Sequence, residues 1–472
     1  MLAAAYIPRE TQESTLVWLL RTHLDAFIEQ AERDSGPGLP GFVERQLRAM
    51  IDCGDLTRGF VRLECSSCRG PRIVPFSCKT RLCSSCAGRR MNEQACHLVD
   101  RVLPRAPYRQ WVLTLPPELA RRVAFDAELA GKVFGLFAAE LARWQEETAR
   151  AAGVDDPQAG SVMEVQRFAD GARLWPHAHV LAPDGVFHEA SDGSVRFVGH
   201  AAPCERDLVL VLTRLESRVL SYLKRLRPAS DEDADESEDP AQLLLACSRT
   251  AAAADTASKP TASPRRRSRP RQRLCVRSET GFELHAEVRV PSHGRGALER
   301  LCRYMARPPI AEDRLVRRED GRVELRLKRA WKGGVRALVF EPVNLIARLA
   351  ALIPLPYQHA RKFFGVFAAR HPLRDRVVPK PPTPTPERPV APKRPGRMGW
   401  ADLLRRVWNI DSLRCPWCGG RMYVVAAIRD PDAIAAIIAS VHAARQRQAP
   451  ARARPALAPR APPPAQGSLR LL

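Results

Sequence analysis

Apolar and polar residues recur with two different periods along this chain, and the two periods separate predicted helices from predicted strands. Residues 14–34 and 42–54 have apolar positions at helical spacing, with a Gly- and Pro-rich loop between them. Residues 108–115 and 160–168 favour strands, and the sequence between them is helical to about residue 151. The pattern therefore predicts an α+β fold.

One further predicted strand and turn, residues 174–186, has the sequence LWPHAHVLAPDGV. Side chains alternate between the faces of a strand, so His177 and His179 share one face while Ala178 and Val180 take the other. Two adjacent imidazoles are a natural beginning for a divalent-metal site. The alternative interpretation is a pair of surface or core histidines that bind nothing.

A third ligand would have to come from another element. Residues 160–168 and 174–186 flank the turn ADGA and are expected to form a hairpin, which brings Glu164 or Gln166 near the histidines if they share that face. The alternation of side chains along each strand does not by itself decide whether Glu164 and Gln166 lie on the face of the histidines. His285, in the alternating stretch GFELHAEVRV, is the other candidate, and its alternative interpretation is a solvent-facing histidine.

A short helix is predicted within ALERLCRYMARPP, residues 297–309, and it must end near Arg307 because two prolines follow. Tyr304 lies on the boundary between an apolar stripe and a basic side, where a phenol beside guanidinium groups is suited to meet a phosphate. The alternative is a tyrosine half-buried for packing. The stripe consists of Leu298, Leu301, Cys302 and Met305, and the basic side of Arg300, Arg303 and Arg307.

The charge of the chain narrows the class of partner. There are 75 Lys and Arg against 52 Asp and Glu, a net charge of +23, which favours a polyanion. No stretch offers about 18 uninterrupted apolar residues, and the first residues do not resemble an export signal. We therefore expect nucleic acid as the partner, and no membrane.

The 13 cysteines are clustered in a way that indicates metal binding more than disulfides. Two Cys-x-x-Cys pairs separated by fourteen residues, Cys65 with Cys68 and Cys83 with Cys86, predict one tetrahedral zinc site. Cys78 either replaces one of these ligands or joins a second site, for which the candidate partners are Cys53, Cys96 and His97.

A third Cys-x-x-Cys pair, Cys415 with Cys418, has no second pair nearby. It either takes ligands from elsewhere in the fold, as a second zinc site, or binds no metal.

Composition also marks the segments between the predicted domains. Residues 228–275 hold blocks of opposite charge that are typical of a disordered insertion. Residues 311–342 are expected to form a β meander. Residues 381–398 are a Pro-rich linker. The predicted organisation is 1–105 helical and zinc-binding, 106–325 catalytic, 326–380 an extension, 399–445 a Cys-x-x-Cys module and 446–472 a disordered tail.

Taken together and in order, seven motifs give the chain a resemblance to one family. The motifs are FSCKTRLCSSCAGRR, RQWVLTLP, VQRF, PHAHVLAPDGVF, GFELHAEV, LERLCRYMARPPIAEDRL and LRCPWCGGRM. They resemble the rolling-circle transposases of the insertion sequence ninety-one type, which are members of the HUH endonuclease superfamily. The resemblance covers roughly residues 15–445 without the charged insertion.

The resemblance implies an HUH-type antiparallel sheet with helices packed on it, a zinc module before it and a Cys-x-x-Cys region after it. It implies that His177, His179 and a polar third ligand hold Mg²⁺ or Mn²⁺ against a phosphate of single-stranded DNA. Tyr304 would attack that phosphate, leaving a 5′-phosphotyrosine and a free 3′-OH, and Arg300, Arg303 and Arg307 would contact the DNA.

The implied partners are single-stranded DNA at the element's termini and target, in the bacterial cytoplasm, with no small-molecule substrate. The resemblance leaves oligomerisation open.

One position departs from the family pattern. Two-tyrosine members carry a second tyrosine one helical turn before the first, and this chain has Arg300 there, which implies a single-tyrosine enzyme. Two rival functions stay open: a replication initiator or relaxase of the same superfamily, and a decayed, zinc-containing DNA-binding protein in which the histidines and Tyr304 are structural.

Overall fold

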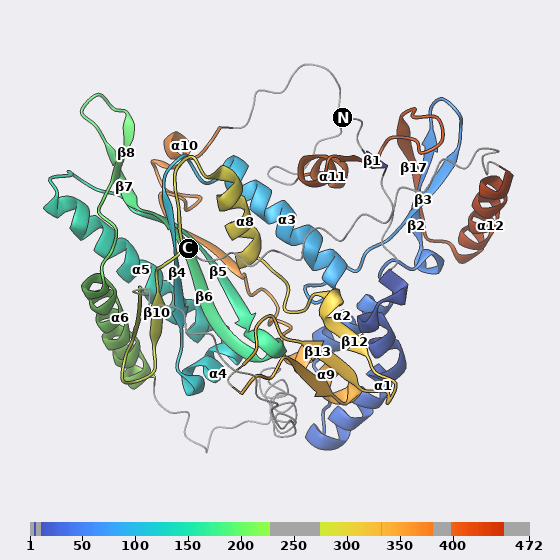
Figure 1. Ribbon diagram of the computed structural model, residues 1–472, viewed down its shortest axis with the longest axis horizontal. Coiled ribbons are helices and arrows are strands. Elements are labelled where there is room, and N and C mark those ends of the chain that lie inside the picture. Colours follow the sequence, from blue (N-terminus) through green and yellow to red (C-terminus); the bar gives the residue numbers. More distant parts are fainter. Residues whose placement is uncertain (1–3, 6–10, 227–273, 332, 381–397, 448–472) are drawn as a thin grey trace. The chain divides into compact units, whose positions relative to one another are not determined.

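The computed structural model describes residues 4–5, 11–226, 274–331, 333–380 and 398–447, and the chain divides into two compact units (Figure 1). The larger unit comprises residues 13–51 and 78–398, and the smaller unit residues 1–12, 52–77 and 399–472. The fold is α+β with antiparallel sheets, as the sequence predicts.

A seven-stranded antiparallel sheet forms the centre of the larger unit, in the order β15-β5-β6-β4-β10-β9, with β11 also beside β4. The predicted hairpin of β5 and β6 is confirmed. The strands are β4 (Tyr108–Thr114), β5 (Gly160–Phe168), β6 (Leu174–Pro183), β9 (Cys275–Arg277), β10 (Glu283–His285), β11 (Arg289–Val290) and β15 (Arg361–Gly365).

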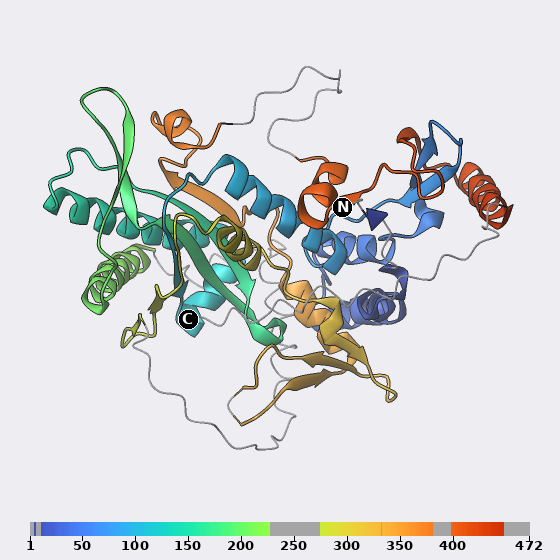
Figure 2. The ribbon, with the colours of Figure 1, turned by 45° about the horizontal axis from the view of Figure 1, so that its top comes forward.

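Helices cover both faces of this sheet. On one face, α4 (Pro117–Phe125), α5 (Ala127–Ala151) and α6 (Glu205–Arg225) bury a large apolar layer. On the other face lie α3 (Ser84–Arg101) and α8 (Arg295–Met305), which run side by side (Figures 1 and 2). Leu298, Leu301, Cys302 and Met305 of α8 are all buried, which confirms the predicted apolar stripe.

The rest of the larger unit consists of a helical layer and two small sheets. Helix α1 (Thr15–Ser35) packs on α2 (Gly41–Ile51) and α9 (Pro342–Ala351), and α10 (Arg374–Val377) follows β15. The hairpin of β7 (Gly185–Glu189) and β8 (Val195–Gly199) continues from β6. The β meander predicted at residues 311–342 is confirmed as β12 (Leu315–Arg317), β13 (Val323–Arg326) and β14 (Ala337–Phe340).

The smaller unit combines segments from both ends of the chain. Its three-stranded sheet has the order β17-β2-β3, from Met422–Ile428, Phe60–Cys65 and Pro71–Pro75. Helix α12 (Pro431–Arg447) packs against β3, and α11 (Trp400–Trp408) lies beside β16 (Ile410–Asp411), which pairs with β1 (Ala4–Ala5). These units do not follow the expected division at residue 105 and at residues 399–445, because β2 and β17 share a sheet.

Two other expected boundaries also change. Most of the insertion expected at residues 228–275 lies outside the described residues, but Cys275 begins β9 because it pairs with β10. The expected extension at 326–380 supplies β15, which pairs with β5 and so belongs to the seven-stranded sheet. The linker at 381–397 and the tail from residue 448 lie outside the described residues.

Candidate active site and metal centres

The two histidines of β6 lie side by side on the face covered by α3 and α8. Their ring centroids are 4.8 Å apart. Strand β5 places Gln166 opposite His177 and Glu164 opposite His179, so all four side chains share this face. The strand register thus shows that Glu164 and Gln166 lie on the face of the histidines, which the alternation of side chains along one strand does not decide.

The ring nitrogens of the two histidines have different hydrogen-bond partners. His177 Nδ1 donates to the Trp175 carbonyl oxygen at 2.9 Å, which leaves Nε2 unprotonated. Gln110 Nε2 lies 3.0 Å from His179 Nδ1 and, as an amide nitrogen, donates to it. A 180° rotation of that amide would let Nδ1 donate to the amide oxygen and would leave Nε2 with the lone pair that a metal ligand needs. Among the described residues, no group hydrogen-bonds this buried Nε2.

Burial keeps both imidazoles neutral. It lowers the pKa of His177, against the effect of the Trp175 carbonyl, and lowers the pKa of His179 well below its usual value. His177 and the Arg307 guanidinium lower the pKa of His179 further. Metal ligation requires the neutral imidazole, so the donor set fits a divalent cation.

Tyr304 stands beside this pair at the last turn of α8. Its ring is 5.8 Å from the His179 ring, edge to face, and the residue is 36% exposed. The guanidinium of Arg307 lies 4.9 Å from the phenol ring centre. Gln166 Nε2 donates to the carbonyl oxygens of Tyr304 (3.1 Å) and Met305 (2.6 Å), which fixes the end of α8 to the histidine strands.

The three arginines of the helix do not form one cluster. Arg307 lies beyond the end of α8 and donates to Gln166 Oε1 at 3.4 Å. Arg303 turns toward Asn92 and Glu299, at 3.4 and 3.7 Å, and Arg300 is exposed. Only Arg307 is therefore in contact with the tyrosine ring.

The candidates for the third ligand differ in what they already contact. Glu164 is buried and pairs with Arg361 at 2.8 Å; burial raises its pKa and the guanidinium opposes that shift. His285 lies opposite Val112, which lies opposite His179, so it shares the face but is two strands away. Over the described residues, neither His177 nor His179 belongs to a close group of three His, Cys, Asp or Glu ligand atoms.

A basic cleft of about 690 Å³ opens next to these residues, within the larger unit. Gln166, Met305 and Arg307 line both the cleft and the tyrosine site, and Glu164 is the acidic residue in its wall. The Lys and Arg side chains in the wall are Lys79, Arg81, Arg90, Arg167, Arg307, Arg361 and Lys362. The arrangement suits a chain of phosphates.

Four cysteines gather in the smaller unit. Cys65 Sγ lies 3.5 Å from Cys418 Sγ, and Cys68 Sγ lies 3.7 Å from Cys415 Sγ. These separations match the edge of a tetrahedral Zn(Cys)₄ site, about 3.8 Å for 2.3 Å bonds. The backbone N–H of Cys68, followed by that of Ser67, lowers the pKa of Cys65 to about 6 despite burial, which favours the thiolate.

Three further cysteines gather in the larger unit, where Cys83 precedes the first turn of α3. Cys78 Sγ is 3.6 Å from Cys86 Sγ, and the sulfur atoms of Cys78, Cys83 and Cys86 all lie within 4.8 Å of one another. The two pairs that the spacing assigns to one ion therefore lie in different clusters. Spacing along the chain gave the wrong partners because β2 pairs with β17, which brings in Cys415 and Cys418.

Two contacts were not anticipated from the sequence. Gln110 orients His179, and its position on a strand beside β6 could have been a signal. Arg361, the partner of Glu164, lies in RKFFG, which does not alternate and is therefore a weak strand signal. In the described part of the chain, no helix is long and apolar enough to cross a membrane.

Comparison with known proteins finds similarity to transposases. A transposase family model matches residues 160–374, and a model described as a transposase zinc-binding domain, of the IS91 type, matches residues 19–115. The chain is also similar to the transposase for insertion sequence element IS801 of Pseudomonas savastanoi pv. phaseolicola, with 22% identity over 403 residues, 83% of this chain and 85% of that protein. No solved structure matches the chain.

Proposed function

We propose that this chain, which belongs to the transposases of the IS91 type with an N-terminal zinc-binding domain, nicks single-stranded DNA and transfers the strand through Tyr304. The observation that carries the proposal is the position of the phenol. A partly exposed tyrosine stands 5.8 Å, ring to ring, from a buried histidine whose Nε2 has no protein partner among the described residues.

The reaction is a transesterification at one phosphodiester. The phenol oxygen of Tyr304 forms a bond to phosphorus, the bond from phosphorus to the 3′ oxygen breaks, and the phenol proton is balanced by protonation of the 3′ oxygen. The product is a 5′-phosphotyrosine and a free 3′-OH. Because the new ester conserves the energy of the broken bond, a 3′-OH of another strand can reverse the step without ATP.

His177, His179 and Gln166 are the residues that would hold a divalent cation, Mn²⁺ or Mg²⁺. When bound, the cation would polarise the scissile phosphate and offset its developing charge. Gln166 is preferred as third ligand because Glu164 is paired with Arg361 at 2.8 Å, whereas the Gln166 amide oxygen accepts only a longer hydrogen bond, 3.4 Å from Arg307. Amide oxygens suit these hard cations.

The chain's own residues position the substrate and the nucleophile. Gln166 ties the backbone of Tyr304 and Met305 to β5, so the phenol and the histidines keep a fixed separation. Arg307 lies against the phenol ring and also lines the basic cleft. A single strand lying in that cleft would have its phosphates next to the tyrosine.

The cysteine clusters support structural Zn²⁺. One ion would be held by Cys65, Cys68, Cys415 and Cys418, and a second by a group that includes Cys78, Cys83 and Cys86. The second group is linked to the cleft, because the backbone N–H of Lys79 donates to Cys86 Sγ at 3.3 Å and Lys79 lines the cleft. Its metal would therefore help to position the cleft wall.

The proposal is tested by incubating the full chain with labelled single-stranded element termini and Mn²⁺, then separating products on a denaturing gel. Wild type should give a covalent protein–DNA adduct that maps to Tyr304, and Tyr304→Phe should give none while it still binds DNA. Tyr222→Phe, on α6 at the opposite face of the sheet, is the matched control and should form the adduct normally. An undiminished adduct in Tyr304→Phe would contradict the proposal.

A further inference from the structure

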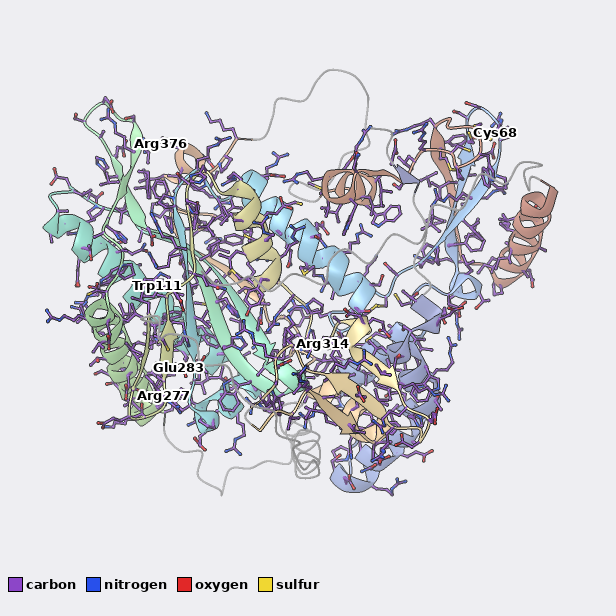
Figure 3. The ribbon with its side chains drawn as sticks, in the orientation of Figure 1. Cys68, Trp111, Arg277, Glu283, Arg314 and Arg376 are labelled. Atoms are coloured by element: carbon purple, nitrogen blue, oxygen red, sulfur yellow. The ribbon has the colours of Figure 1, made fainter. Side chains whose placement is uncertain are left out.

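Three metal-binding atoms converge at the outer edge of the seven-stranded sheet. Strands β9 and β10 place Cys275 opposite His285, and Glu283 lies two residues before that histidine. Figure 3 labels Glu283 on β10. Cys275 Sγ is 3.2 Å from His285 Nε2, and Glu283 Oε1 is 2.6 Å from the same nitrogen. The sulfur and the carboxylate oxygen are 3.6 Å apart.

Hydrogen bonds can join the three groups in pairs, with the Cys275 thiol and the His285 Nε2–H both donating to Glu283 Oε1. A single cation placed between the three atoms would instead be bound by all of them. One sulfur, one nitrogen and one oxygen atom within 4.8 Å of one another form a donor set that suits such an ion.

The distances are close to those that zinc requires. A tetrahedral zinc ion with ordinary bond lengths separates such donor atoms by about 3.4–3.6 Å. The sulfur-to-oxygen distance already fits, and the contact of His285 with Glu283 would have to open by roughly 0.8 Å. That movement is available because these side chains are 39% and 33% exposed.

We propose that Cys275, Glu283 and His285 form a three-residue site for a zinc-class divalent cation, with its fourth position toward solvent. Thiolate and imidazole ligands favour Zn²⁺ over Mg²⁺. The site lies on the same face as His177 and His179, but two strands away, about 10 Å at the usual strand spacing. It is separate from both cysteine clusters and does not depend on the proposed nuclease chemistry.

The first test is the metal content of the full chain after equilibration with buffered Zn²⁺, measured by plasma mass spectrometry. Cys275→Ser and His285→Ala should each hold one zinc ion fewer per chain than wild type. The matched control is Cys204→Ser, which changes an exposed cysteine outside the clusters, and its zinc content should equal that of wild type. Equal zinc content in all four proteins would overturn the proposal.

A second measurement does not depend on whether the variants fold, because it uses the wild-type chain. Zn²⁺ should slow alkylation of Cys275 by iodoacetamide about tenfold, since a metal-bound thiolate is shielded, and should leave Cys204 unaffected. Glu283→Gln, which keeps the side-chain shape, should reduce that protection. An alkylation rate at Cys275 that does not respond to Zn²⁺ would contradict the site.

Discussion

The two faces of the seven-stranded sheet differ in kind, although the same strands supply both. On β6, Ala178, Val180 and Ala182 lie in the apolar layer under α4, α5 and α6. The alternate positions of the same strand, His177 and His179, face α3 and α8 beside Tyr304. Strand alternation thus places side chains for packing and side chains for chemistry within one residue of each other.

The buried polar groups of the histidine face are stabilised by specific partners on neighbouring strands. Most polar groups of the histidine face have partners: Gln110 contacts His179, Gln166 holds α8, and Arg361 pairs with Glu164. The exception is His179 Nε2, which has no partner among the described residues. The apolar face is stabilised mainly by the close packing of apolar side chains. Substitutions on the two faces should therefore separate activity from stability.

The largest effect is expected from the double substitution His177→Ala and His179→Ala. Cleavage of single-stranded DNA in Mn²⁺ should fall about 10³-fold or more, because a bound cation contributes several kcal/mol to the transition state. Thermal unfolding should change little, since the apolar layer is untouched. Single-turnover assays measure the cleavage rate, and circular dichroism measures thermal unfolding. Full cleavage by wild type in excess EDTA would exclude a metal role for this face.

Asp184 directly follows β6, on the apolar side of the sheet. Substituting it tests how much this side contributes to stability. The buried carboxylate accepts from Arg109 at 2.8 and 3.1 Å and from Arg289 at 3.0 Å. Asp184→Ala should lower the free energy of unfolding by about 3–5 kcal/mol, because it leaves a buried guanidinium uncompensated. Urea denaturation measures the loss. Asp192→Ala, in the exposed β7–β8 turn, is the control and should have little effect.

Gln166→Ala is expected to reduce cleavage about 10- to 100-fold, the usual range for residues that hold or orient metal ligands. Gln166→Glu retains an acceptor oxygen and should recover part of the rate. Glu164→Gln, on the same strand, should leave cleavage within a few-fold of wild type. If Glu164→Gln has the larger effect in a folded protein, Glu164 and not Gln166 is the third ligand.

The smallest effect is expected from Val180→Ala, next to His179 on the opposite face. Loss of two buried methyl groups should cost about 1–3 kcal/mol of stability. Cleavage below the unfolding transition should be unchanged. A strong loss of activity in this variant, with the protein folded, would mean that the two faces are coupled.

The sequence by itself determined the local features of this protein. Its periodicity gave the α+β class, the β5–β6 hairpin, the shared face of His177 and His179, and the apolar stripe of α8. Each of these depends on neighbours within a few residues, so the repeat of side-chain direction along a strand or a helix is sufficient to predict it.

Only the tertiary structure decided which distant groups meet. Cys65 and Cys418 are 353 residues apart, and their contact follows from the pairing of β2 with β17. The positions of Glu164, Gln166 and His285 relative to the histidines required the strand register, and the role of Arg361 required β15. Periodicity assigns a side chain to a face, but packing and strand pairing decide what lies opposite that face.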